Sequence, residues 1–202
     1  MPGAMRSPSA VHPPLVSTIL PAASPAATLA RSAVLALAGS LLLTASAKAA
    51  IPLWPVPFTM QTFAVLVIGM AYGWRLGAAT VLLYLAQGAL GLPVFQGGGG
   101  IGYMLGWTGG YLLAFPLAAA LVGWLAERGW GRHFLATAAA QALGTALIFL
   151  FGVAWLARLE GLSAALASGL YPFVPGALLK IALATALVPA AWHWKQRFAR
   201  GE

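Results

Sequence analysis

The chain of 202 residues has no cysteine and no aspartate, and its only acidic residues are Glu127, Glu160 and Glu202. Without thiols, disulfide bonds, cysteine nucleophiles and thiolate metal sites are excluded. Without a carboxylate pair, most general acid–base chemistry is excluded as well. The sequence also lacks the G-x-x-x-x-G-K-S/T pattern that binds nucleoside triphosphates, so this chain does not itself hydrolyse ATP.

Histidine is scarce too, with one residue each at His12, His133 and His193. None of them pairs in the sequence with a nucleophile or with a set of metal ligands. An intramembrane enzyme acting on a lipid or acyl substrate needs such a pair, so it is a weak alternative. We therefore expect no catalytic residue, no metal and no cofactor.

Charged residues make up 7% of the chain and hydrophobic residues 61%, against about 25% and about 45–50% in soluble domains. A soluble surface cannot be built from so few charges, and the apolar residues come in long runs typical of membrane spans. A net charge of +8 would suggest nucleic acid in a soluble protein. Here the basic residues cluster near the ends of the apolar runs, which indicates a lipid bilayer and no nucleic acid.

The pattern predicts an all-α membrane protein, a bundle of six transmembrane helices. Residues 1–28 hold six of the fourteen prolines, so we expect a disordered Pro/Ala-rich tail there. The membrane domain is expected over 29–195, followed by a short basic tail over 196–202. Two of the six segments are shorter than the usual span of about 20 residues, so five spans is the alternative. The six segments are 29–47, 58–73, 76–90, 108–126, 134–157 and 172–193.

The basic residues predict the orientation of these segments. With six spans, both termini lie on one side, and cations are enriched on the cytoplasmic side of membrane proteins. We therefore expect cytoplasmic termini and outward loops over 48–57, 91–107 and 158–171. The other side receives only Lys48 and Arg158, whereas the terminal side collects Arg6, Arg31, Arg75, Arg128, Arg132, Lys195, Arg197 and Arg200.

Lys180 is a charge deep inside the last apolar segment. It lies about eight residues from the outward start of that segment, or about 12 Å deep at 1.5 Å per residue. A lysine at the bilayer centre costs about 2.5–3.5 kcal/mol, and such charges are usually functional. No acidic residue lies within two helical turns. We expect Lys180 to face an outward cavity and bind an anionic ligand group, the alternative being that it snorkels to the interface.

Neutral polar residues and a glycine-rich loop supply the other candidate ligand contacts. Tyr84 and Gln87 are three apart and so share a helix face. The loop after residue 96 contains Gly98 and Gly99, which allow backbone to approach a ligand closely. Each polar residue has an alternative role in hydrogen bonding between helices. The remaining polar candidates are Gln61, Thr62, Thr108 and Gln141.

The first segment carries small residues at a spacing of four, which lets another helix approach closely. The approaching helix is either a neighbour in this chain or another subunit, and a homo-oligomer is one such arrangement. The candidate partner-binding residues are Ser32, Ala36, Ser40, Ala45 and Ala49.

Several motifs in one order resemble the BioY family over roughly residues 30–195. BioY proteins are the biotin-specific substrate-capture (S) components of energy-coupling factor (ECF) importers. The motifs are Pro55-Val-Pro-Phe-Thr-Met-Gln-Thr62, Gly91-Leu-Pro-Val-Phe95, the glycine run, Thr108-Gly-Gly-Tyr111, and Pro175-Gly176 followed by Lys180.

The resemblance implies uptake of biotin across the bacterial inner membrane. It also implies capture from the outer side and partnership with a transmembrane T subunit and two ATPase subunits. The implied contacts are Lys180 for the valerate carboxylate, Gln61 or Gln87 for the ureido ring, and aromatic walls from Phe58, Tyr84 and Tyr111.

Two positions depart from the family pattern. Ala177 stands where the family commonly has aspartate, and Trp107 stands where it commonly has proline. We hypothesise that the ligand carboxylate itself neutralises Lys180. The alternatives are an S component for another small carboxylate vitamin, a solitary biotin carrier, and a structural scaffold without a ligand.

Overall fold

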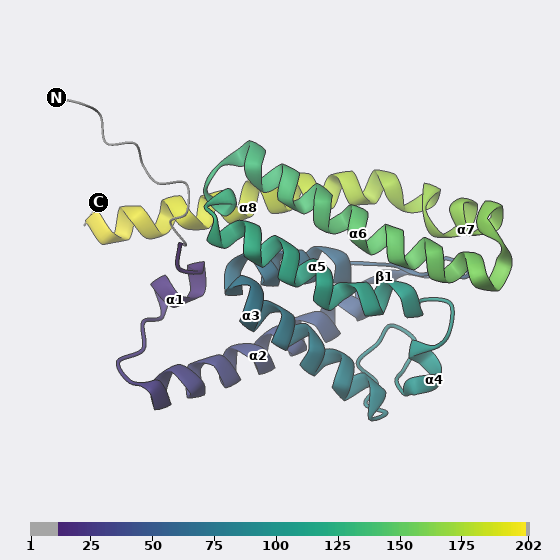
Figure 1. The fold of residues 1–202 in the computed structure, drawn as a ribbon, viewed down its shortest axis with the longest axis horizontal. Helices are drawn as coiled ribbons and strands as arrows, with labels where there is room; N and C mark the ends of the chain where they lie inside the picture. The colour runs from purple at the N-terminus through teal and green to yellow at the C-terminus, as the bar shows by residue number, and fades with distance from the viewer. Residues whose placement is uncertain (1–11, 201–202) are drawn as a thin grey trace.

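The computed structural model describes residues 12–200 of the chain, with side chains described as far as residue 195. The described part is almost entirely helical (Figure 1). Its α-helices are α1 (Leu15–Ile19), α2 (Pro25–Lys48), α3 (Gln61–Ala89), α4 (Ile101–Met104), α5 (Gly109–Glu127), α6 (Phe134–Glu160), α7 (Leu162–Gly169) and α8 (Val174–Arg200). Two short 3₁₀ helices, η1 (Trp130–Arg132) and η2 (Tyr171–Phe173), and the strands β1 (Ala50–Ile51) and β2 (Phe58–Thr59) complete it.

Helix α3 is folded back on itself at Gly73. The Gly73 backbone has φ 80° and ψ 174°, a conformation that glycine adopts without steric cost. The Gln61 side-chain amide donates to the Tyr84 hydroxyl over 2.7 Å, although a straight helix would hold residues 23 positions apart about 35 Å from each other. The arms 61–72 and 74–89 therefore pack antiparallel.

The expected bundle of six transmembrane segments is confirmed. Five stretches are long and apolar enough to cross a membrane, and one of them contains both arms of α3. The two expected short segments, 58–73 and 76–90, are these arms. Helices α2, α5, α6 and α8 supply the other four segments.

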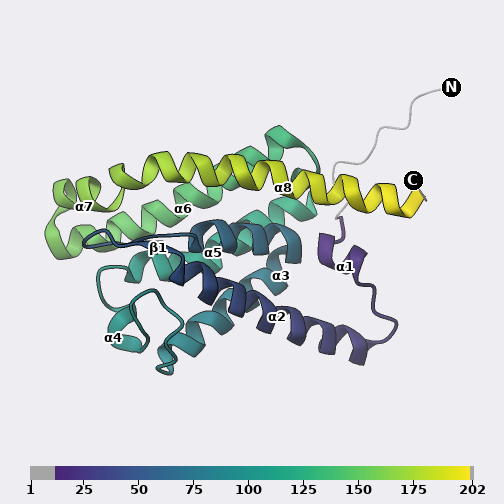
Figure 2. The ribbon, with the colours of Figure 1, turned by 180° about the vertical axis from the view of Figure 1, so that it is seen from behind.

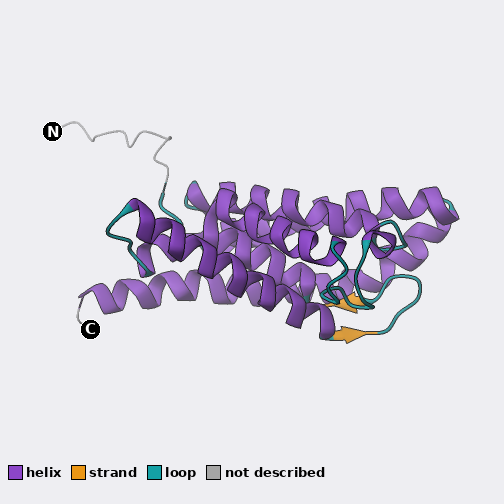
Figure 3. Ribbon diagram, turned by 90° about the horizontal axis from the view of Figure 1, so that it is seen from below, coloured by secondary structure: helices purple, strands orange, loops and turns teal. Residues whose placement is uncertain are grey.

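The two ends of the bundle differ in what they carry. The start of α2, helix α1 and the end of α8 lie at one end, and α4, α7 and β1 lie at the other (Figures 1 and 2). Viewed from below, both strands lie at the end opposite the C-terminus (Figure 3). Helix α5 is central, because 61% of its most apolar stretch is buried, against 17% for α2. Helix α2 is thus the peripheral element.

The structure differs from the expected disordered tail over 1–28. Within the described part, residues 12–28 are ordered: the His12 amide donates to the Glu127 carbonyl over 2.6 Å, and α2 begins at Pro25. Ser24 accepts from the Ala27 amide and Pro25 occupies the first helical turn, a combination that starts helices. Residues 1–11 lie outside the described residues.

At the other terminus, α8 continues to Arg200, through most of the expected tail over 196–202. Basic residues at a helix C-terminus interact favourably with the helix dipole. The continuation fits that preference, and residues 201–202 lie outside the described part.

Candidate binding site

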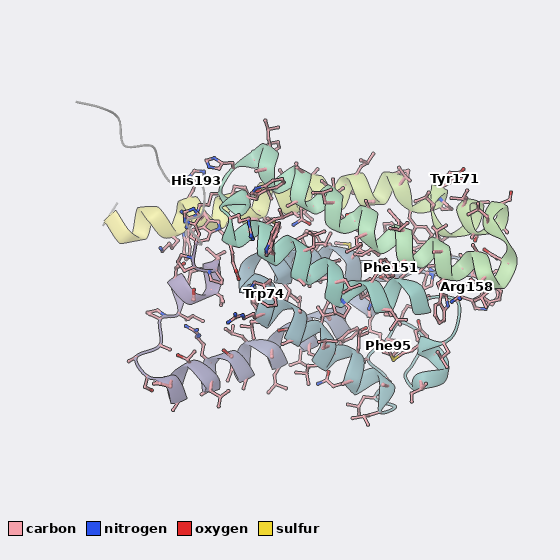
Figure 4. All side chains as sticks on the ribbon, in the orientation of Figure 1. Trp74, Phe95, Phe151, Arg158, Tyr171 and His193 are labelled. Atoms are coloured by element: carbon pink, nitrogen blue, oxygen red, sulfur yellow. The ribbon has the colours of Figure 1, made fainter. Side chains whose placement is uncertain are left out.

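A cavity of about 70 Å³ lies between the helices at the end that carries the strands. The β1–β2 segment and the loop between α3 and α5 cover it. Figure 4 shows Phe95, one of its lining residues, at the same end of the bundle as Arg158 and Tyr171 and far from His193. Its lining includes Phe58, Thr59, Gln61, Thr62, Phe95, Thr108, Tyr111, Gln141, Thr145, Ala177 and Lys180.

Lys180 in α8 has only neutral partners. Its Nζ donates to the Thr59 carbonyl and, over 3.1 Å, to the Thr62 hydroxyl. The same Nζ lies 4.0 Å from the centroid of the Phe58 ring. Among the described residues Lys180 makes no ion pair. A half-buried ammonium without a counter-ion is well suited to an anionic ligand, since partly buried charges are otherwise costly.

The side chain of Phe58, a residue of β2, packs against α8. Strands β1 and β2 pair antiparallel, with Phe58 opposite Ile51, and the Phe58 ring stacks on Phe173 at 6.0 Å between centroids. Any Cβ at position 176 would overlap the Phe58 ring, so only glycine leaves room for this packing. The ring therefore forms a fixed wall beside Lys180.

A polar network lies behind that wall. The Gln61 amide donates to the Tyr84 hydroxyl over 2.7 Å, and Tyr84 donates to the Val94 carbonyl over 3.1 Å. Gln61 is 5% exposed and also bonds with Thr59 over 3.3 Å. The network fixes the amide of Gln61 at the cavity surface.

The opposite wall comes from α5 and α6. The Tyr111 hydroxyl donates to the Gly169 carbonyl over 2.7 Å, which fixes its ring. Trp155 donates to the Gly106 carbonyl over 3.0 Å and anchors the loop that leads to Thr108. Gln141 and Thr145 are one turn apart on α6 and add polar groups to an otherwise apolar surface.

The structure brings six of the ten expected ligand-contact residues to the cavity: Phe58, Gln61, Thr62, Thr108, Tyr111 and Lys180. Tyr84 lies behind Gln61 and does not line the cavity. Gln87 lies between helices, where its side-chain oxygen accepts from the Ser40 hydroxyl. Gly98 forms a backbone bridge with Phe95, and Gly99 packs against the Leu92 carbonyl. Neither glycine lines the cavity.

On the expected small-residue surface of α2, Ser40 fits the alternative of a neighbouring helix in this chain. Ser40 is 1% exposed and bonds Gln87 of α3, so it contacts a neighbouring helix of this chain and is not available to another subunit. Its small size allows α2 to approach α3. Ser32 and Ala36 are half-buried, and Ala45 and Ala49 are exposed.

Several lining residues escaped the sequence analysis. Thr145 carries a detectable signal, because it lies four residues after the polar candidate Gln141 and shares one face of an apolar helix with it. Phe115 and Phe149 carry none, since aromatic residues are ordinary in such helices. Phe95 sits in a loop, and nothing in its neighbourhood predicts that its ring is fully buried.

Comparisons with known proteins identify the family of the chain. A sequence model of the BioY family matches residues 17–197, which is most of the chain. The chain belongs to the BioY family. Members of this family are transport proteins and not enzymes.

Individual BioY relatives extend the match. A probable biotin transporter BioY from Pyrococcus horikoshii is 38% identical over 147 residues, covering 72% of this chain and 86% of that protein. The biotin transporter BioY of Thermotoga maritima is 36% identical over 148 residues, with 72% and 86% covered. A crystal structure of the S-component for biotin from an ECF-type ABC transporter superposes with a TM-score of 0.70. That structure is 24% identical, covers 81% of this chain and 91% of its own, and shows the shared fold.

Proposed function

We propose that this BioY protein is the S component that captures biotin from the outer side of the inner membrane. It delivers biotin inward together with a T subunit and two ATPase subunits. The observation that carries the proposal is Lys180, a cation whose partners among the described residues are all neutral, at the surface of a cavity lined mainly by aromatic, aliphatic, amide and hydroxyl groups.

Each part of biotin has a matching group in the cavity. The valerate carboxylate accepts a charge-assisted hydrogen bond from Lys180, which is stronger than a neutral one. The ureido ring offers donors and acceptors to Gln61, Gln141 and Thr145. The apolar thioether ring packs against aromatic walls such as Tyr111, where burial is favourable.

Ala177 supports the role of the ligand carboxylate. It lines the cavity one turn before Lys180 and brings no charge. Because an aspartate at this position would neutralise Lys180, alanine leaves that task to the ligand. The same substitution keeps an S component for another small carboxylate vitamin as a second candidate.

The placement of the other cations supports the orientation. The end of the bundle that carries the terminus of α8 holds three arginines in or beside its helix turns: Arg75, Arg128 and Arg132. The cavity end holds Lys48 and Arg158. Under the positive-inside rule the cavity then opens outward and the termini are cytoplasmic. The sequence carries no ATP-binding motif, so any ATP hydrolysis that drives delivery would occur on partner subunits.

Equilibrium binding of labelled biotin to the purified, detergent-solubilised chain tests the proposal. Saturable binding that is displaced by unlabelled biotin is expected without any partner subunit. Competition by desthiobiotin and by unrelated carboxylate vitamins separates biotin from the second candidate. No binding of biotin to a folded, monodisperse sample would contradict the proposal.

Uptake in cells separates an S component from a solitary carrier. We expect accumulation of labelled biotin only where the T subunit and ATPases are co-produced. Equal uptake without them would favour a chain that works alone.

A further inference from the structure

Lys48 contacts the cavity wall from the far side. It is the last residue of α2, and its Nζ donates to the Phe95 carbonyl over 2.6 Å and to the Gln96 carbonyl over 3.4 Å. A cation at a helix C-terminus normally stabilises the carbonyls of its own last turn. Here it reaches a loop 47 residues further along the chain.

The loop that Lys48 binds carries a wall of the cavity. Phe95 is fully buried and lines the cavity. Its ring meets Tyr84 edge-on at 5.4 Å and stacks on Tyr103 at 5.2 Å. A Cβ at position 88 would overlap the ring, so Gly88 of α3 leaves the space that Phe95 fills.

The backbone of this loop is held at three consecutive carbonyls. Tyr84 binds the Val94 carbonyl, and Lys48 binds those of Phe95 and Gln96. The Phe95 amide closes the turn on the Gly98 carbonyl over 2.9 Å. Two of these three hydrogen bonds come from the Lys48 ammonium. They are the stronger ones, because a hydrogen bond from a charged donor is stronger than one between neutral groups.

We propose that Lys48 is a positioning residue that latches the Phe95 loop over the cavity and so sets how long the bound ligand stays. The identity of the bound ligand as biotin rests on the proposed function. It joins the peripheral helix α2 directly to the cavity wall. Releasing it opens the loop without removing any group that contacts the ligand.

Hydrogen exchange on the ligand-free chain tests the latch itself. In Lys48→Met, which keeps the length and removes the charge, exchange of the Phe95 and Gly98 amides becomes about ten-fold faster. Lys48→Arg restores the cation and stays within two-fold of the wild type. The control is Arg158→Met, an exposed cation at the same end of the bundle, which also stays within two-fold. Faster exchange confined to the last turn of α2 would reduce Lys48 to a helix cap and overturn the proposal.

Dissociation of labelled biotin tests the consequence. The same Lys48→Met chain releases biotin about ten-fold faster, with an association rate within about three-fold, and Lys48→Arg releases it at the wild-type rate. A loop that opens faster while biotin leaves at the wild-type rate would overturn the proposal. Absence of biotin binding by the wild-type chain would contradict the proposed function instead, and the exchange rates would still decide whether Lys48 holds the loop.

Discussion

At the cavity end of the bundle, Lys48 and Lys180 donate to neutral oxygens: backbone carbonyls and the hydroxyl of Thr62. At the opposite end three arginines lie over tryptophan rings, whereas Arg31 donates to the Leu20 carbonyl over 2.6 Å. Arg128 lies 3.3 Å from the ring centroid of Trp124.

Two further pairs repeat this arrangement at the opposite end. Arg132 lies 4.5 Å from the Trp192 centroid, and Arg75 lies 5.1 Å from that of Trp74. Tryptophan and arginine are typical of the membrane–water interface, where the cation also meets lipid headgroups. We expect these pairs to stabilise this end of the bundle.

The difference shows that the partner of a cation, more than its position in the sequence, indicates its role. A cation over a tryptophan ring away from the cavity gains a favourable contact with that ring. Lys180 also lies over a ring, that of Phe58, but it does so beside a cavity and with no ion pair among the described residues, so its charge stays available to a ligand. The predictions that follow test whether the two ends really divide anchoring from binding.

Lys180→Met should have the largest effect. Biotin affinity falls by about 100-fold or more, because a charge-assisted hydrogen bond at a half-buried site is lost. Lys195→Met is the matched control, since it changes the same residue type in the same helix at the anchoring end, and its affinity stays within two-fold. Equal losses in both variants, measured by equilibrium binding, would erase the distinction between the ends.

Gly176→Ala should have the next largest effect. The added methyl overlaps the Phe58 ring and displaces the wall beside Lys180, so biotin binds about ten-fold more weakly. Gly102→Ala serves as the control, because nothing lies within 4 Å of a Cβ there. Titration with labelled biotin compares the two, and similar affinities would show that the Phe58 wall does not matter.

Arg132→Gln should change stability and leave binding alone. Losing the contact with Trp192 lowers the free energy of unfolding by about 0.5–2 kcal/mol. Thermal unfolding in detergent measures this loss, and biotin affinity measured on the same sample stays within two-fold. A drop in affinity at unchanged Tm would place Arg132 in the binding function and break the comparison.

Deletion of residues 1–20 should have the smallest effect on binding. It removes α1, which lies at the anchoring end (Figure 1), so biotin affinity stays within two-fold. Loss of binding in a monodisperse sample of the shortened chain would show that the two ends are coupled.

The sequence predicted the bundle and the centre of the site because both have local signals. Apolar runs reveal helices, and a lysine inside one of them stands out wherever it occurs. Phe58, Gln61 and Thr62 belong to the same short Pro-rich motif. Residues so close in the sequence also lie close in space, so a motif that predicts one of them at the site predicts all three. The break in α3 was also indicated, since Trp74 and Arg75 interrupt two apolar runs.

Contacts between distant segments had no such signal. Ser40 and Gln87 are 47 residues apart, and a small-residue stripe looks the same whether it faces a neighbouring helix or another subunit. Lys48 and Phe95 are equally far apart. Only the packing of α2 on α3 and the return of the α3–α5 loop bring these pairs together.

The central claim is that Lys180 binds the carboxylate of biotin, and a comparison of biotin with its neutral amide tests it most directly. The wild-type chain should prefer biotin over biotin amide by about 100-fold, and Lys180→Met should bind both with similar, weak affinity. This pairing isolates the interaction between the two charged groups from any general damage to the site. A Lys180→Met chain that still prefers biotin by the wild-type factor would contradict the account.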